Sequence, residues 1–403
     1  MTQPVIMQWS MSSFFGWGIY GLNLGLHWAG DPAIEPFCVS PIDAGQIAID
    51  PLRERAILPF LVRSLQFQAK ISRHTNGAAN ANAPLLLALG NGFLGSSAVH
   101  NVVLEGKPTI GVIFFEEALD TDAIRRGKEL SLIITGSTWN ERVLRAYGFE
   151  RVRTILQGID PTHFHPAPKL GVMGDRFLIF SGGKAEMRKG QDIVMAAFKI
   201  FAKHHPEATL VTAWHSPWPH FARSLDQTGL AAPVVFDKDG RLDVGAWAGA
   251  NDIPAEQIID LGNVPNVSMP PILREMDAAV FTNRSEGGTN LVAMECMACG
   301  IPVILSRNTG HLDLIKDDNC YPLDDQMAVE NRWTSVGDVA CWGESRVEEV
   351  VERFEQIFTD RAAARQRGMR AATMMQAMTW AETARQMKEV VLDAAKDVVS
   401  KAA

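Results

Sequence analysis

Two lysines and two glutamates in the second half of the sequence have types and positions that suit a diphosphate joined to sugar hydroxyls. Lys184 and Lys189 lie in the glycine-rich segment SGGKAEMRKG, and Glu286 and Glu295 flank the segment GGTNLVAM. Two ammonium groups can neutralise a diphosphate, and carboxylates accept hydrogen bonds from hydroxyl groups. The joint pattern is more specific than its parts, because a lone glycine pair or glutamate more often belongs to an ordinary turn.

The segment 278–305 is expected to position the two glutamates as a strand, a glycine turn, a short helix and a second strand. Thr289 or Asn290 can cap the helix, and Gly300 followed by Pro302 can end it. Glycines let the backbone approach a ligand, and unpaired N–H groups at a helix N-terminus attract anions. We therefore expect a phosphate or a sugar at this turn.

Strand-length apolar runs alternate with helical periodicity in both halves of the chain, which predicts two α/β domains with parallel sheets. The proline-rich segment 161–168 (PTHFHPAP) reads as the linker between domains 1–165 and 166–382. Ligands of open parallel sheets bind beyond the carboxyl ends of the strands, so two such domains would face each other across a cleft. Residues 361–388 have a helical period, and a charged, alanine-rich helix is expected to follow them.

The first half opens with a strand at 5–9 and a glycine loop. Gly16, Gly18 and Gly21 have the G-x-G-x-x-G spacing of dinucleotide-binding loops. No second strand ending in an acidic residue follows at the expected distance, so the spacing also fits a turn that only packs a helix on a strand.

Composition excludes several classes of protein. The 403 residues are 47% hydrophobic and 21% charged, with a net charge of −8, which argues against broad nucleic-acid binding. No apolar run is long enough to cross a membrane, and no secretory leader is evident. Five scattered cysteines, including the pair Cys296 and Cys299 inside the expected helix, indicate core thiols in a reducing cytosol. Because the two lysines already supply positive charge, we expect neither a metal nor another cofactor. The Asp-x-Asp at 120–122 reads as a helix start, with metal binding as the alternative.

Residues 51–74 form a basic, amphipathic segment that Pro59 is expected to interrupt. On an acidic protein, such a helix can lie on a membrane surface or face an acidic substrate. The alternative is a solvated helix that packs on a core.

From about Gly136 onward, the sequence resembles the family-4 retaining glycosyltransferases. The matching segments are VRTILQGIDPTHFHP, FSGGKAEMRKG, LGNV, MDAAVF, SEGGTNLVAMECMACGIPV and QAMTWAETARQM. The resemblance implies the GT-B fold, in which two Rossmann-like domains face each other across a cleft and the helix near 383–403 packs back on the first. It also implies transfer of a sugar from a nucleoside-diphosphate sugar to a hydroxyl of a glycan, lipid or small molecule, as in polysaccharide biosynthesis, without a metal. The enzyme would be cytoplasmic or bound to the cytoplasmic face of a membrane.

The resemblance also implies roles for individual residues. Lys184 and Lys189 would neutralise the donor diphosphate, Glu286 would contact the transferred sugar, and Glu295 would bind the ribose hydroxyls. The remaining donor-binding residues would be Gly287, Gly288, Thr289, Asn290 and Leu291 in the signature loop, Asn263 and Val264 against the base, and Gly16 and Gly18 near the donor phosphate and acceptor.

Two departures from the family pattern affect these roles. Eight residues separate Glu286 from Glu295, where the family has seven, so the loop at Gly288 and Thr289 is expected to be enlarged. The family often has a histidine after the fourth strand of its first domain, and this chain has VIFFEEALD, in which Glu116 or Glu117 could take a polar role towards sugar or acceptor. No general base is indicated, and the resemblance suggests a same-face route in which the leaving phosphate assists deprotonation of the acceptor.

Two other functional classes stay open from the sequence. One is another chemistry on the same fold, such as sugar-nucleotide epimerisation or phosphorolysis. The other is a non-catalytic protein that keeps the nucleotide-sugar pocket, because a fold does not fix a function.

Overall fold

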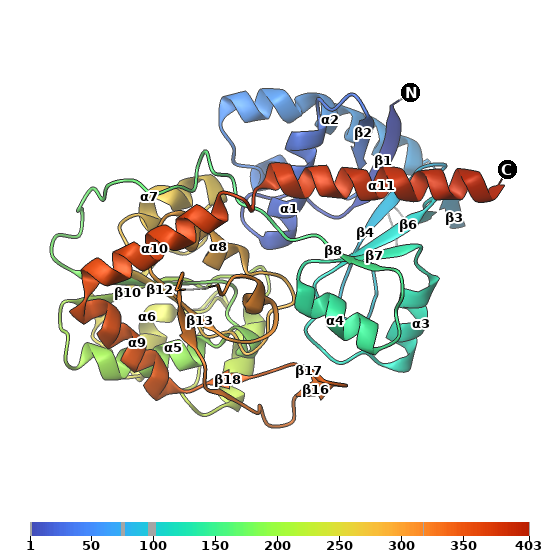
Figure 1. Ribbon diagram of the computed structural model, residues 1–403. Helices are drawn as coiled ribbons and strands as arrows, with labels where there is room; N and C mark the ends of the chain where they lie inside the picture. Colours follow the sequence, from blue (N-terminus) through green and yellow to red (C-terminus); the bar gives the residue numbers. More distant parts are fainter. Residues whose placement is uncertain (1, 74–76, 96–101, 317, 403) are drawn as a thin grey trace. The chain divides into compact units, whose positions relative to one another are not determined.

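The computed structural model (Figure 1) describes residues 2–73, 77–95, 102–316 and 318–402. The chain divides into two compact units. Unit 1 comprises Met1–Gly158, Pro265–Val267 and Met378–Ala403, and unit 2 comprises Ile159–Val264 and Ser268–Ala377. The divisions fall a few residues from the boundaries expected at 165 and 382, and a three-residue segment of unit 1 interrupts unit 2.

Unit 1 contains a six-stranded parallel sheet in the order β2-β1-β4-β6-β7-β8. Its strands are β1 (Gln3–Gln8), β2 (Ile34–Cys38), β4 (Leu85–Leu89), β6 (Thr109–Ile113), β7 (Leu132–Thr135) and β8 (Val152–Thr154). A separate parallel pair joins β3 (Gly77–Asn80) to β5 (Val102–Glu105). The central strands are runs of buried apolar residues, as expected when helices cover both faces of a sheet.

The helices of unit 1 are α1 (Gly16–Trp28), η1 (Ala44–Gln46), α2 (Pro51–Ile71), α3 (Thr121–Glu129), α4 (Thr138–Ala146) and α11 (Trp380–Ala402). Helix α11 packs against α1, where Trp28 Nε1 donates to the Ala384 carbonyl at 3.1 Å and Lys388 Nζ lies 2.6 Å from Asp31 Oδ2. The single helix expected from 361 to 388 was wrong, because the chain breaks after Met375 and α11 starts at Trp380.

The prediction that Pro59 interrupts the helix was wrong. Helix α2 is continuous from Pro51 to Ile71, and the Asp50 side chain caps it by accepting hydrogen bonds from two backbone N–H groups. Pro59 faces solvent, as does Arg55, whose carbonyl loses its helical partner. Water can therefore satisfy that carbonyl, and the buried face, which includes Ile57 and Phe60, holds the helix on the unit.

Unit 2 also contains a six-stranded parallel sheet, in the order β11-β10-β9-β12-β13-β14. Its strands are β9 (Phe177–Gly182), β10 (Ala208–Ala213), β11 (Ile258–Asp260), β12 (Ala278–Phe281), β13 (Val303–Ser306) and β14 (Tyr321–Leu323). Two short antiparallel pairs accompany it: β15 (Gln326–Met327) with β18 (Glu344–Ser345), and β16 (Ser335–Val336) with β17 (Val339–Ala340).

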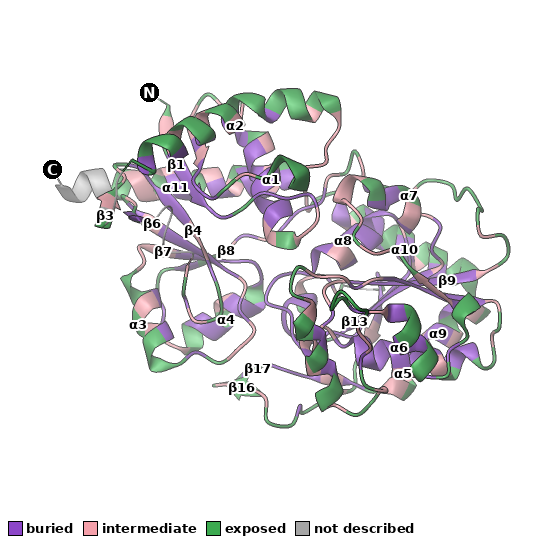
Figure 2. Cartoon of the chain, turned by 180° about the vertical axis from the view of Figure 1, so that it is seen from behind, coloured by how far each residue is buried: buried purple, intermediate pink, exposed green. Residues whose placement is uncertain are grey.

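The α-helices of unit 2 are α5 (Gln191–Ala202), α6 (Val244–Ala250), α7 (Met269–Leu273), α8 (Leu291–Ala298), α9 (Val347–Thr359) and α10 (Arg361–Met375). Its 3₁₀ segments are η2 (Met187–Lys189), η3 (Pro219–Gln227), η4 (Ala255–Gln257) and η6 (Thr309–Asp313), and η5 (Asn266–Ser268) lies at the boundary with unit 1. Figure 2 shows the strands of each sheet as buried and the outer sides of the helices as exposed. Each unit thus has the helix-covered parallel sheet of a Rossmann-like domain, as the sequence predicts.

Candidate functional site

The candidate residues of unit 2 follow strands of one parallel sheet. Lys184 and Lys189 come after β9, and Glu286 comes after β12, which pairs directly with β9. Because parallel strands end at the same edge, these loops meet beyond the carboxyl ends of neighbouring strands, where ligands of such sheets bind.

Glu286 lies in a buried cluster of cations and amides. Its carboxylate contacts Lys189 Nζ, accepts a hydrogen bond from Asn283 Nδ2 at 2.7 Å, and lies 3.6 Å from the Arg188 guanidinium. Burial raises the pKa of Glu286, but Lys189 and Arg188 outweigh that effect and lower it to about 2. Burial lowers the pKa of Lys189 below its usual value, although Glu286 opposes the change. Glu286 is therefore ionised throughout the neutral range.

Arg188 joins the two lysines that the sequence singled out. Its guanidinium lies 2.6 Å from Glu186 Oε1, and Lys184 Nζ lies 3.2 Å from the other oxygen of the same carboxylate. The structure thus brings Lys184 and Lys189 together through Glu186 and Arg188. Sequence reasoning missed these two residues, although both stand in the run EMRK between the lysines.

A second buried arginine, Arg284, fixes the loop that carries Glu286. Its side chain is fully buried and contacts both oxygens of Asp192, at 2.9 and 2.7 Å, and Glu344 Oε2 at 2.6 Å. It also donates to the Met187 carbonyl at 2.7 Å. Arg284 therefore ties the loop after β12 to η2, which contains Lys189. Arg284 was not among the site residues predicted from the sequence.

The glycines of the signature loop meet the loop after β13. The backbone N–H of Gly310 donates to the Glu286 carbonyl at 2.9 Å, and a Cβ at Gly310 would lie 1.7 Å from the Gly288 carbonyl oxygen. The Glu286 N–H donates to Thr309 Oγ1 at 2.8 Å. Only glycine at 310 allows this approach, and the loop holding Gly287, Gly288 and Thr289 is buried.

Helix α8 begins as the capping signal predicts. Asn290 is its N-cap, accepts a hydrogen bond from Ala293 N at 3.3 Å, and has a left-handed backbone (φ 65°), which asparagine tolerates. Leu291 is the first residue of the helix, and Glu295 lies buried in its second turn.

His311 contacts the side chain of the N-cap residue Asn290. Its Nδ1 lies 3.1 Å from the Ser306 carbonyl and its Nε2 lies 3.1 Å from Asn290 Nδ2, so a neutral ring that donates from Nδ1 and accepts at Nε2 satisfies both contacts. Burial lowers the pKa of His311 to about 4, which keeps the ring neutral at physiological pH.

The remaining candidates of unit 2 follow β11, two strands from β9 in the sheet. Asn263 is exposed and Val264 is partly buried. Asp260, the last residue of β11, lies 2.6 Å from His215 Nε2 in the loop after β10. That hydrogen bond raises the pKa of His215 and ties the two loops together.

Unit 1 holds a second group of candidates at the carboxyl edge of its own sheet. Gly16 and Gly18 form the first turn of α1, and a Cβ at Gly18 would lie 2.4 Å from the Ser12 Cβ. Glu116 and Glu117 follow β6 and are partly exposed, and the Glu116 N–H donates to Asn91 Oδ1 at 3.1 Å.

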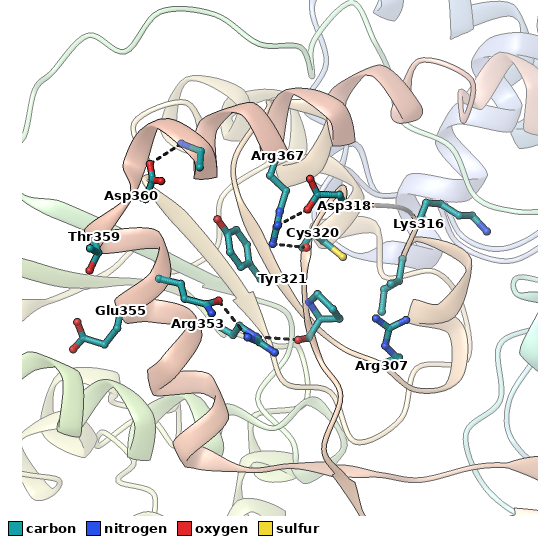
Figure 3. A pocket seen from close by; sticks show the side chains of 14 residues that line it. Arg307, Lys316, Asp318, Cys320, Tyr321, Arg353, Glu355, Thr359, Asp360 and Arg367 are labelled. Carbon is teal, nitrogen blue, oxygen red and sulfur yellow. Dashed lines mark hydrogen bonds and ion pairs between the residues drawn. The ribbon is translucent and has the colours of Figure 1, made fainter.

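A cavity of 1080 Å³ lies elsewhere in unit 2, next to the edge strand β14 (Figure 3). None of the candidate residues lines it. Its arginines are already engaged: Arg353 donates to the Pro322 carbonyl at 3.1 Å, and Arg367 pairs with Asp318. Within the described part of the chain, no cluster of three or more His, Cys, Asp or Glu residues is arranged to hold a metal ion.

Comparison with known proteins supports the resemblance. Residues 269–387 match the model of a family described as family 4 glycosyltransferase in conflict systems. A GDP-mannose-dependent alpha-(1-6)-phosphatidylinositol monomannoside mannosyltransferase of Mycolicibacterium smegmatis is 25% identical over 190 residues, 45% of each chain. A D-inositol 3-phosphate glycosyltransferase of an Arthrobacter strain is 23% identical over 252 residues, 59% of this chain and 48% of that protein. This chain therefore matches less than half the length of these relatives.

Solved structures superpose on nearly the full length of the chain at low identity. Sucrose-phosphate synthase from Thermosynechococcus elongatus superposes with a TM-score of 0.63 and 16% identity, covering 97% of this chain and 98% of that chain. Anabaena HepE in complex with UDP-glucose superposes with a TM-score of 0.61 and 12% identity, covering 97% and 99%. Residues 269–387 are thus similar to the family-4 glycosyltransferases, and the chain as a whole has the GT-B fold of two Rossmann-like domains.

Proposed function

We propose that this protein transfers a sugar from a nucleoside-diphosphate sugar to a hydroxyl group, with retention of configuration at the anomeric carbon. The observation that carries the proposal is the charged cluster at the carboxyl edge of the unit 2 sheet, in which Lys189 and Arg188 contact Glu286 and Glu186 joins Arg188 to Lys184. Anabaena HepE, a structural neighbour, was solved with UDP-glucose, which supports a nucleotide sugar as the ligand of this fold.

The cations would act mainly on the leaving group. Negative charge grows on the diphosphate as the sugar departs, and preorganised cations stabilise that charge more than they stabilise the bound donor. Lys189 and Arg188 already lie beside the Glu286 carboxylate, so a bound sugar would meet a fixed acceptor for its hydroxyls. Glu295 on α8 would bind the ribose, and the N–H groups of the signature loop would hold sugar or phosphate.

The electrostatics of Glu286 favour a same-face route. A carboxylate whose pKa is about 2 is a weak base at neutral pH, so Glu286 is poorly suited to deprotonate the acceptor. We assign it instead to orienting the sugar, and the leaving phosphate to accepting the proton. Because side-chain cations supply the positive charge, we expect turnover to continue in the presence of EDTA.

Substitution of two residues tests the proposal. Lys189→Ala and Glu295→Ala should abolish release of nucleoside diphosphate in the presence of acceptor, with the circular dichroism spectrum unchanged. Lys199→Ala is the matched control for the lysine, because Lys199 on α5 pairs with Asp252, which follows α6, at 2.8 Å and outside the signature loop. Full activity in both site variants would remove the proposal.

The same assays separate the other two classes. Change of the sugar without acceptor, or its release by inorganic phosphate, would identify an epimerase or a phosphorylase. Nucleotide binding with no diphosphate release in any acceptor screen would identify a non-catalytic binding protein.

Helix α2 supports a peripheral membrane contact, and we propose that it rests on the cytoplasmic face of an anionic bilayer. Among the described residues, no helix is both long and apolar enough to cross a membrane. Helix α2 nevertheless exposes an apolar stripe with basic neighbours Arg55 and Lys70 on the same surface. The apolar residues and their exposed fractions are Leu52 (80%), Leu58 (42%), Val62 (43%) and Leu65 (52%).

Vesicle binding tests this contact. The double variant Leu58→Gln/Leu65→Gln should lose co-sedimentation with vesicles containing phosphatidylserine, and Leu170→Gln, which changes an exposed leucine of unit 2, should not. Equal sedimentation of all three proteins would show that α2 is a solvated helix.

A further inference from the structure

Two large aromatic side chains beside Lys184 are exposed to solvent. Trp218 is 52% exposed and Phe221 is 43% exposed, and both follow β10 directly, in the loop and first turn of η3. Their rings lie 5.8 and 5.5 Å from Lys184 Nζ, within the range of a cation–π contact. An apolar surface of this size next to a cation suggests a ligand that is both planar and anionic.

The aromatic segment is held in place by the loop that carries the cations. The backbone N–H of Gly183 donates to the Ala213 carbonyl at 3.1 Å, and that of Ala185 donates to the Trp214 carbonyl at 3.0 Å. The Met187 N–H donates to Ser224 Oγ at 2.8 Å, which joins η2 to η3. The two loops therefore form one built surface rather than two independent ones.

The order of the strands places this surface between two expected subsites. β10 lies between β9, whose loop carries Lys184, and β11, whose loop carries Asn263. Neighbouring strands are about 4.8 Å apart, so the outer two loops are roughly 10 Å apart. A nucleoside diphosphate that reaches from the cations towards the loop after β11 would cross the loop after β10, the segment that carries Trp218 and Phe221.

We propose that Trp218 and Phe221 form the stacking surface for the base of the donor nucleotide. Their ring centres are 6.4 Å apart and their planes meet at 55°, so a base that stacks on one ring presents its edge to the other. Both arrangements are favourable for aromatic rings, and every base has a π face, so the surface binds the base without selecting its identity. The inference rests on the proposed function, because it takes the ligand to be a nucleoside diphosphate.

Calorimetric titration of the full chain with UDP, GDP and inorganic pyrophosphate tests the inference. The double variant Trp218→Ala/Phe221→Ala should bind UDP and GDP on the order of 10-fold more weakly, which is the usual effect of losing base stacking. Its affinity for pyrophosphate, which has no base, should stay that of the wild type. The single variant Trp218→Phe keeps an aromatic ring and should retain most of the wild-type nucleotide affinity. Leu170→Ala is the control for loss of an exposed apolar side chain and should bind nucleotides like the wild type.

The outcomes distinguish three cases. Unchanged nucleotide affinity in the double variant would overturn the inference and leave the proposed function intact. Equal weakening of UDP and pyrophosphate would also overturn it, because the rings would then act only by holding Lys184. If the wild-type protein bound neither UDP nor GDP, the proposed function would fail first.

Discussion

Replacement of Arg284 by methionine should destabilise unit 2 more than any exposed arginine substitution. Methionine is similar in length to arginine but uncharged, so the fully buried Asp192 carboxylate would lose its counter-charge. Its remaining described side-chain partner would be the Thr228 hydroxyl. Glu344 is 20% exposed and can turn to water. Removal of one partner from a buried ion pair costs about 3–5 kcal/mol, because the other charge stays desolvated.

The size of this effect can be measured by urea unfolding followed by tryptophan fluorescence and by calorimetry. For a unit of about 200 residues, 1 kcal/mol corresponds to roughly 2–4 °C, so we expect the melting temperature of unit 2 to fall by about 10 °C. Arg346→Met is the control, since Arg346 is 50% exposed, its ion pairs are 3.4 and 3.7 Å long, and such pairs contribute about 1 kcal/mol or less.

A second variant separates loss of charge pairing from poor packing. Asp192→Asn in the Arg284→Met background removes the uncompensated charge and should recover part of the lost stability. If Arg284→Met cost less than about 1 kcal/mol, or if the second substitution destabilised further, the electrostatic account of Arg284 would be refuted.

Three further predictions concern the signature loop and the residues of η6 that contact it. Gly310→Ala should shift the signature loop, because the new Cβ would lie 1.7 Å from the Gly288 carbonyl oxygen. We expect the free energy of unfolding to fall by about 1–3 kcal/mol and nucleotide binding to weaken. A nucleotide affinity equal to that of the wild type in calorimetry would contradict this prediction. Asn290→Ala should cost about 2 kcal/mol from the lost cap and the left-handed backbone, whereas Asn290→Gly, which tolerates positive φ, should cost less in thermal unfolding; equal losses would argue against backbone strain. The pKa of His311 is lower in the folded chain than in the unfolded chain, so its contribution to the free energy of unfolding is complete above pH 6.5. As the pH falls towards about 4, the free energy of unfolding should decrease by about 3 kcal/mol, because the unfolded chain binds the proton first. Urea unfolding at pH 7.5 and pH 5 should show part of this decrease in the wild type and none of it in His311→Gln.

The alternation of strands and helices, and the meeting of the two lysine- and glutamate-bearing loops, could be predicted from the sequence. A short apolar run and a capping residue are local sequence signals, so the strand Ala278–Phe281 and the helix cap at Asn290 could be predicted. The role of Arg284 was not, because Asp192 is 92 residues away and no local pattern records the pairing. Likewise, the prolines around Trp218 prevent any helical or strand period, so η3 (Pro219–Gln227) could not be predicted from the sequence.

The missed break between α10 and α11 had a local signal. Thr379 Oγ1 accepts a hydrogen bond from Glu382 N at 3.2 Å, and Thr-x-x-Glu is the spacing of a capping box. The helical period alone did not predict this break, because residues 376–379 contain neither glycine nor proline, the residues that usually mark the end of a helix.

The return of α11 to unit 1 has a consequence for how the protein is made. Met387 and Val391 are completely buried in unit 1, and Trp28 donates its indole N–H to Ala384. These partners leave the ribosome only after all of unit 2 has been synthesised. During translation, the side of α1 that contacts α11 therefore stays exposed until unit 2 has been synthesised. Because exposed apolar surface recruits chaperones, we expect chaperone dependence during translation to be concentrated in unit 1.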